Sequence, residues 1–238
     1  MHALSIVRQL ISNKLVRYSA GLWSLPIDRP DAALPAALEG TLSTRVASLG
    51  DEARTLAECL SLQQEQPSLE LCRLISGATT DQQLFVSLIE LAQHDVLYAD
   101  RGSFRFSSLA LRDVLLSGMD ASRLGRNHRR LGEAFAKYLD AQRPELQLEA
   151  GWHLIQGGDE LRGADLIADV AKDGVLIRGV LANLYRAGHQ LEAALLVYTR
   201  HGRSAYERLP LLSSLAQAGY YEDRIWADRY GDSALELL

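Results

Sequence analysis

Apolar residues return every three to four positions along most of this chain, which is the spacing of helices that bury one face. In the first such segment polar side chains interrupt the apolar ones, as in an amphipathic helix and unlike a signal peptide. Asp51 and Thr80 each stand where a helix N-cap is expected, and Gln83 completes a capping box with Thr80. Helices are therefore predicted over residues 1–17, 38–46, 51–60, 68–76, 80–93, 109–116 and 121–139.

Two other segments favour β-hairpins. Residues 15–18 and 22–25 flank a bend with a glycine, and residues 96–98 and 104–106 flank a turn of sequence Asp-Arg-Gly-Ser. Residues 27–35 contain two prolines and no apolar period, which indicates a linker. Three helices followed by the second hairpin form the pattern of a winged helix.

The last third of the chain repeats with a period of about 30 residues. Residues 158–164 align with residues 188–194, and a degenerate third copy begins at Gly219. A leucine lies four residues before each leading glycine, and Ala164 and Ala194 are small enough for close helix packing. The pattern favours helix hairpins of tetratricopeptide type that turn at each glycine. A non-repeating helical bundle with glycine turns is the alternative.

The composition of the 238 residues, 47% hydrophobic and 23% charged, is that of a chain with a substantial core. A formal charge of −5 opposes a protein that coats nucleic acid. Cys59 and Cys72 are expected to be small buried residues, without a redox or metal role. No apolar run approaches the roughly 18 residues that cross a bilayer, so a cytoplasmic protein without a membrane partner is expected.

Motifs that carry chemistry are missing from the sequence. It contains no phosphate-binding loop, no G-x-G-x-x-G, no H-E-x-x-H, no G-x-S-x-G and no paired C-x-x-C. We therefore expect no enzyme activity, no cofactor and no metal, the six histidines being far apart in the sequence. Carboxylate pairs such as Glu58 with Glu65 and Asp159 with Glu160 are expected on solvated surfaces.

The winged-helix pattern raises DNA binding as an alternative function. Arg101 and Arg105, in the second hairpin that would form the wing, could contact a phosphate backbone. The helix that would read the groove carries no Lys or Arg, whereas Asp81 and Glu90 make it acidic, so phosphates would repel it. A winged helix that faces protein is favoured.

The predicted helix over residues 121–139 carries a basic stripe, at steps of three and four, formed by Arg123, Arg126, Arg129 and Arg130. One interpretation is a solvated face that Glu133 and Asp140 balance. The other is a docking strip for an acidic partner or a phosphate.

The order of these motifs resembles the part of the signal-transduction ATPases with numerous domains (STAND) that follows their nucleotide-binding core. The resemblance lies in residues 2–26, 34–61, 104–119, 123–139 and 150–167. Residues 2–26 look like the end of the ATPase lid, and residues 150–167 resemble the first repeat.

The resemblance implies a mainly α fold with small β-hairpins. Residues 1–37 would be a remnant of the lid with a linker, residues 38–118 a winged-helix-like domain, and residues 119–238 a long helix with tetratricopeptide-like repeats. The nucleotide-binding core is not part of this sequence, so the ATPase activity of the family is not carried over.

The same resemblance marks Ser108, His128 and His153 as positions of family motifs. Relatives often place a phosphate-sensing histidine where this chain has Ser108, and a serine there also suits a helix N-cap. The resulting hypothesis is a non-catalytic regulatory segment of a STAND-type signalling ATPase or transcription regulator. It would bind partner proteins through its helical repeats, or an ATPase core in cis or in trans, with a DNA-binding winged-helix regulator as the alternative.

Overall fold

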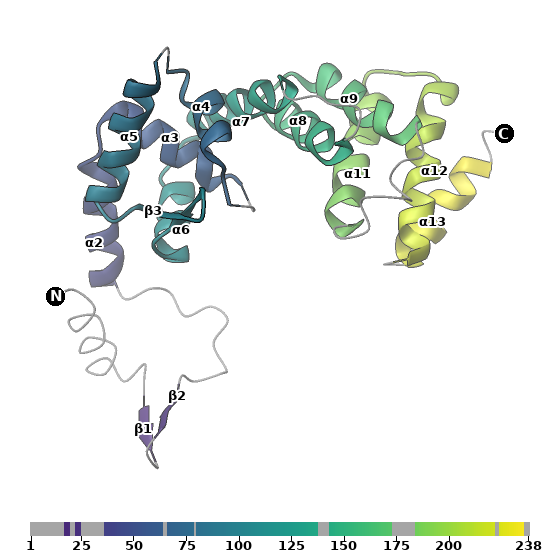
Figure 1. Cartoon of the computed structure of the whole chain (residues 1–238). Coiled ribbons are helices and arrows are strands. Elements are labelled where there is room, and N and C mark those ends of the chain that lie inside the picture. Colours follow the sequence, from purple (N-terminus) through teal and green to yellow (C-terminus); the bar gives the residue numbers. More distant parts are fainter. Residues whose placement is uncertain are drawn as a thin grey trace. The chain divides into compact units, whose positions relative to one another are not determined.

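The computed structural model describes residues 17–19, 22–24, 36–63, 66–78, 80–137, 143–172, 184–221 and 224–235 (Figure 1). This part of the chain is mainly α-helical. The predicted amphipathic helix at the start and the predicted linker over residues 27–35 lie outside it. The chain divides into two compact units, Met1–Gly40 and Thr41–Leu238. Among the helices described, none is both long and apolar enough to span a membrane.

The first unit contains a small antiparallel hairpin. β1 (Arg17–Ser19) pairs with β2 (Leu22–Ser24), and Tyr18 lies opposite Trp23. The predicted hairpin is confirmed, with its first strand slightly later in the chain. α2 (Ala36–Ala47) follows and continues into the second unit.

α3 (Asp51–Ser61) is the central helix in the first half of the second unit. Its predicted apolar stripe is buried, namely Ala53, Leu56, Ala57 and Leu60. This stripe explains why four later helices pack on it. They are α4 (Leu69–Ser76), α5 (Asp81–Gln93), α6 (Leu109–Ser117) and α7 (Ala121–Ala136).

Side-chain oxygens cap the starts of these four helices, through Ser68, Thr80, Ser108 and Asp120. The prediction that Asp51 caps α3 is wrong, because Gly50 occupies the N-cap position and Asp51 is the first helical residue. The N–H of Gly50 donates to Oε1 of Glu90 at 2.6 Å. A carboxylate of α5 thus satisfies this N–H, while the exposed Asp51 favours the positive end of the helix dipole.

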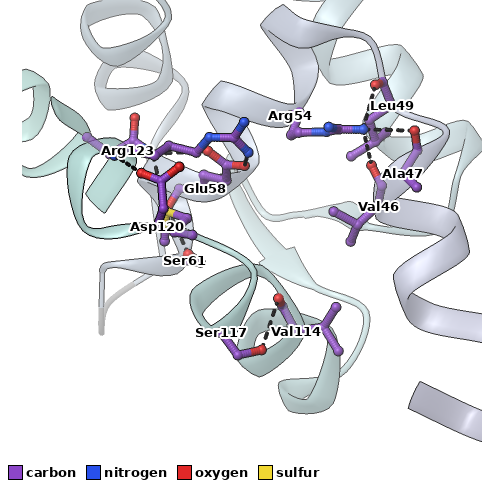
Figure 2. A network of polar contacts seen from close by, with 12 residues as sticks. Val46, Ala47, Leu49, Arg54, Glu58, Ser61, Val114, Ser117, Asp120 and Arg123 are labelled. Atoms are coloured by element: carbon purple, nitrogen blue, oxygen red, sulfur yellow. Dashed lines mark hydrogen bonds and ion pairs between the residues drawn. The ribbon is translucent and has the colours of Figure 1, made fainter. Parts of the chain in front are cut away.

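The turn between α2 and α3 is closed by one guanidinium (Figure 2). Nη2 of Arg54 donates to the carbonyl oxygens of Val46, Ala47 and Leu49 at 3.1, 2.8 and 3.4 Å. The first two carbonyls lie in the last turn of α2 and the third in the turn that follows, where no later turn of helix satisfies them. Arg54 therefore ties the end of α2 to α3.

The second hairpin joins β3 (Leu97–Asp100) to β4 (Ser103–Phe106), as predicted. Its two turn residues, Arg101 and Gly102, both have positive φ, 50° and 88°, which matches the twist of a two-residue hairpin. The segment before α4 pairs with β4, since the N–H of Phe104 donates to the carbonyl of Pro67 at 2.9 Å and Ser68 bridges to Ser103.

α7 ends at Ala136, before the predicted end at residue 139. Pro144 begins α8 (Pro144–Gln156), where its missing N–H leaves no intrahelical bond unmade.

The predicted thirty-residue repeat holds at its first glycine turn and fails at the next two. Gly158, with φ 87°, turns the chain from α8 into α9 (Glu160–Lys172). Gly188 lies inside α11 (Leu184–Arg200), and Gly219 lies inside α12 (Ala205–Tyr221). Another glycine turn of the described residues is at Gly202, with φ 66°, and α13 (Arg224–Leu235) follows α12.

The reason is that a continuous apolar stripe spans Gly188. Ala187, Leu191 and Ala194 are buried together with residues of α8, α9 and α12 in one core. Glycine inside a helix costs only about 1 kcal/mol, which the burial of this stripe outweighs. The small Ala164 and Ala194 are fully buried in the same core, as predicted.

Glycines set the distance between the helices of the second half. A Cβ built on Gly151 of α8 would lie 2.6 Å from the carbonyl oxygen of Gly163 in α9, and one built on Gly163 would lie 2.5 Å from that of Gly151. On the other side of α8, a Cβ on Gly132 of α7 would lie 2.7 Å from Cγ of Leu154. α8 thus touches both neighbouring helices at near-backbone distance.

The substitution Gly151→Ala is expected to lower the free energy of unfolding by about 3 kcal/mol, because the methyl group would force α8 and α9 apart. Gly125→Ala is the matched control, since a Cβ on this helical glycine meets nothing within 4 Å. It should raise stability by up to about 1 kcal/mol. Urea denaturation followed by circular dichroism measures both values. Equal effects of the two substitutions would contradict the close contact.

Candidate functional site

α7 and the helices packed on it hold most of the residues that the sequence marks as candidate site residues. Arg123, Arg126, Arg129 and Arg130 lie on α7, as does His128, and His153 lies on the neighbouring α8. α7 also contacts α3 and α4. The site is therefore built where the first and second halves of this unit meet.

The structure separates Arg123 from the other three arginines. Nη1 of Arg123 lies 3.0 Å from Oε1 of Glu58 in α3, and Nδ2 of Asn127 donates to Oε2 of the same carboxylate at 3.1 Å (Figure 2). Glu58 is only 4% exposed, so the prediction that it lies on a solvated surface is wrong. Burial of a carboxylate requires such partners, and Arg123 thus has a structural task.

Arg126, Arg129 and Arg130 remain exposed on α7. Arg126 donates to the Ser122 hydroxyl one turn earlier. Glu133, which was expected to balance the stripe, instead pairs with Arg162 of α9, 2.8 Å from its Nη1. The pKa of Glu133 is lowered chiefly by that hydrogen bond. Asp140 lies outside the described residues.

The two histidines of the predicted site meet in the structure. Nδ1 of His128 and Nδ1 of His153 are 2.8 Å apart, and Nε2 of His153 is 2.9 Å from the Gln63 side-chain nitrogen. An amide nitrogen only donates, so Nε2 of His153 accepts and its Nδ1–H donates to His128. The ring of His153 also stacks on Phe135. These two histidines are 25 positions apart in the sequence, and the fold brings their rings into contact.

Both imidazoles are held in the neutral state. Burial lowers the pKa of His128 to about 4. Burial also lowers the pKa of His153 well below its usual value, and the neighbouring His128 and Arg186 act in the same direction. The hydrogen bonds require the same state, because Nδ1 of His128 needs a free lone pair to accept from His153, and Nε2 of His153 needs one to accept from Gln63.

Residues of α11 complete this polar network. Glu149 of α8 pairs with Arg186 and accepts from Nε2 of Gln190 at 2.9 Å, while its Oε2 lies 3.8 Å from Nε2 of His153. The network thus runs from Gln63, just after α3, through α7 and α8 to α11. Hydrogen bonds between buried groups are directional, so they fix how these helices sit on one another.

Sequence reasoning missed Glu58, Gln63 and Glu149 as members of the site. A signal existed for Glu58, which interrupts the otherwise apolar run from Leu56 to Leu60. A charged residue within such a run points to a buried partner. No comparable signal marks Gln63, whose role depends on contacts made about ninety residues away.

Ser108, the third position of the family motif, accepts a hydrogen bond from the N–H of Leu111 at 3.2 Å and caps α6. The predicted N-cap is therefore confirmed. Cys59 and Cys72 are free and buried, as expected, and burial raises the pKa of each thiol to about 12. Within the described ranges, no group of three His, Cys, Asp or Glu residues is placed to hold a metal ion.

The candidate DNA-contact residues lie apart from α7, on the second hairpin. Arg101 is exposed at its turn. Arg105 is engaged by Asp100 on the opposite strand, with Nε 2.9 Å from Oδ2. Asp81 at the start of α5 pairs with Arg73, also at 2.9 Å. Among the described residues, Arg101 is therefore the exposed cation of this hairpin that forms no ion pair.

Comparison with known proteins gives one similar structure. No protein-family model matches the sequence, and no curated protein matches it either. A crystal structure of a STAND protein with a tetratricopeptide repeat sensor, from Pyrococcus horikoshii, is similar at a TM-score of 0.47 and 14% sequence identity. The similarity covers 87% of this chain and 34% of that chain, so this chain spans about a third of the length of that protein.

The free energy of unfolding is expected to fall by about 2 kcal/mol between pH 7 and pH 4.5. His128 is partly exposed, so this loss is smaller than the free energy that corresponds to the full shifts of the two pKa values. Both histidines have a lowered pKa in the folded state, so the unfolded chain binds more protons as the pH falls below 6.5, the usual histidine value. Urea unfolding at a series of pH values measures this slope. His128→Asn keeps an acceptor for His153 and should flatten the slope. Parallel curves for the two proteins would contradict the assignment.

Arg123→Met is expected to lower the free energy of unfolding by about 2 kcal/mol, because the buried Glu58 would lose its cation. The control Arg126→Met, on the same helix and exposed, should change it by less than about 0.5 kcal/mol. Thermal and urea unfolding of the three proteins gives the comparison. A loss of similar size in both variants would show that Arg123 has no special structural task.

Proposed function

We propose that this chain is a regulatory segment of a STAND-type signalling ATPase, which binds partner proteins and catalyses no reaction itself. Residues 38–118 would form a winged-helix-like domain, and residues 119–238 a long helix with tetratricopeptide-like repeats. The chain would act by holding a partner, or an ATPase core in cis or in trans.

The observation that carries the proposal is how the second hairpin is joined to its helices. β4 pairs with β3 on one side. It also pairs with the segment at Pro67 and Ser68, which lies between α3 and α4. A short extended segment between the first two helices, added to the edge of a terminal hairpin, is the arrangement of a winged helix. α6 and the long α7 then lead from this domain into the stacked helices.

The helices from α8 onward support a binding role. Antiparallel pairs such as α8 with α9 contact neighbours on both sides, as in helical-repeat proteins that bind ligands along extended faces. The junction at α7 offers Arg126, Arg129 and Arg130, exposed at helical spacing on a chain of net charge −5. Planar guanidinium groups pair well with carboxylates, which favours an acidic segment of a protein partner.

DNA binding remains the second candidate, and the exposed Arg101 is the observation in its favour. Two observations oppose it. Asp100 already neutralises Arg105, and the exposed face of α5 has no basic residue with which to hold phosphates. A gel-shift series on random duplex DNA decides between the two, because DNA binding requires retardation that grows as the salt concentration falls.

Calorimetry of the purified chain with two titrants tests the proposal. An acidic peptide with several Glu and Asp residues is expected to bind, and its affinity should weaken as salt rises. The triple variant with Arg126, Arg129 and Arg130 replaced by Gln should bind it at least about tenfold more weakly, at about 0.5–1 kcal/mol for each pair. Mg-ATP should give no heat.

The matched control replaces Arg200, Arg203 and Arg229, which pair with carboxylates elsewhere on the surface, by Gln. This variant has the same net charge as the first triple variant. An equal loss of peptide affinity in both variants would show that the peptide responds to net charge and does not bind specifically at the three arginines of α7. Micromolar binding of ATP would overturn the non-catalytic part of the proposal.

A further inference from the structure

α5 is apolar on two faces, and within the described part of the chain one of them is packed against other elements. Its inner face packs through the buried Leu84, Leu88 and Leu91. On its outer face three large apolar side chains are exposed, Phe85 by 45%, Val86 by 58% and Ile89 by 55%. A surface helix normally has one apolar stripe and a polar remainder, and none of the elements that the structure describes buries the second stripe.

The outer residues have the spacing that helices use to pack on one another. Phe85 and Ile89 are four positions apart, and Val86 and Ile89 are three apart, so their side chains form one patch. Gln82 and Gln93 are exposed one turn before and one turn after it. We call Gln82, Phe85, Val86, Ile89 and Gln93 the outer stripe of α5. Contiguous exposed apolar side chains of this kind mark interaction surfaces.

The charges around the outer stripe are negative. The chain has no Lys or Arg between Arg73 and Arg101, and Arg73 is paired with Asp81. At the far end of the stripe Glu90 accepts from Gly50, which brings the exposed Asp51 and Glu52 close to the end of α5, and the exposed Asp95 follows the helix.

The guanidinium of Arg54 lies in the same region and keeps its positive charge while it donates to three backbone carbonyls. The carboxylates of Asp51, Glu52, Glu90 and Asp95 outnumber this single cation. The end of the outer stripe therefore keeps an excess of negative charge.

We propose that the outer stripe of α5 docks the apolar face of a basic amphipathic helix from a partner protein. Apolar residues at i, i+3 and i+4 provide the contact area, and the carboxylates beyond Glu90 select a helix with Lys or Arg beside its apolar face. This surface is separate from the arginine strip on α7, so it goes beyond the proposed function above.

The same charges disfavour two other occupants. An anionic membrane surface would be repelled by the acidic end of α5, although it could accept the apolar side chains. A second copy of the chain would bring like carboxylates together when two α5 helices pair. Both occupants are outcomes that the experiment below detects.

The test uses the full chain and three synthetic 18-residue peptides. The first is an amphipathic helix of Leu and Lys, the second has the same pattern with Glu in place of Lys, and the third is a scrambled Leu and Lys sequence. Fluorescence anisotropy at physiological salt should show binding of the first peptide with a Kd of about 10 µM. The other two should bind at least about tenfold more weakly.

Matched variants tie the binding to α5. Ile89→Gln should weaken the binding of the Leu and Lys peptide about tenfold. Leu196→Gln, a similarly exposed aliphatic residue on α11, should leave the binding unchanged. The triple arginine variant of α7 should also bind normally, which separates this proposal from the previous one. Unchanged thermal unfolding of each variant confirms that the fold is intact.

Several results would overturn the proposal. They are equal binding of the Glu peptide, no effect of Ile89→Gln, or an equal effect of Leu196→Gln. Light scattering that shows a dimer dissociated by Ile89→Gln would assign the stripe to a second copy. Sedimentation of the chain with anionic vesicles, lost in Ile89→Gln, would assign it to a membrane.

Discussion

The position of α8 depends on contacts at near-backbone distance with the helices on both sides. Gly132 of α7 receives Leu154, and Gly151 and Gly163 face each other across α8 and α9. Close packing at these glycines brings polar side chains of α8 within reach of α7, α11 and the segment that follows α3. Glu149 and His153 therefore find partners on α7, on α11 and at Gln63. A shift of α8 would leave these buried groups without hydrogen bonds, which is costly in a low-dielectric interior.

This arrangement gives the two ends of α7 different roles. Near its start, Arg123 and Asn127 satisfy the buried carboxylate of Glu58 and hold α7 on α3. Toward its end, Gly132 and Phe135 face α8. The arginines that take part in neither contact are those left for solvent or a partner. The structural demand on α7 therefore determines which part of its basic stripe is available for recognition.

Much of the local structure could be predicted from the sequence, because it depends on neighbours in the chain. The stripe on α3, the Thr80 and Ser108 caps and the turn at Arg101-Gly102 all follow from short-range rules. What depends on distant contacts could not be predicted. Gly188 and Gly158 look alike in sequence, yet tertiary packing keeps one inside a helix and leaves the other at a turn. The meeting of His128 with His153, and of Gln63 with His153, likewise requires the packed fold.

The two apolar faces of α5 have a consequence for how this helix keeps its orientation. Where a helix has one apolar stripe, that stripe alone determines which side turns inward. In α5 the buried leucines and the exposed Phe85, Val86 and Ile89 form two apolar faces roughly 140° apart around the helix axis, so either face could in principle turn inward. Polar contacts at the two ends must supply the difference, through the Thr80 cap and the bond from Gly50 to Glu90. The hydrogen bond to the Glu90 carboxylate thus restrains the rotation of α5 about its axis, and it helps to determine which apolar face α5 presents to its surroundings.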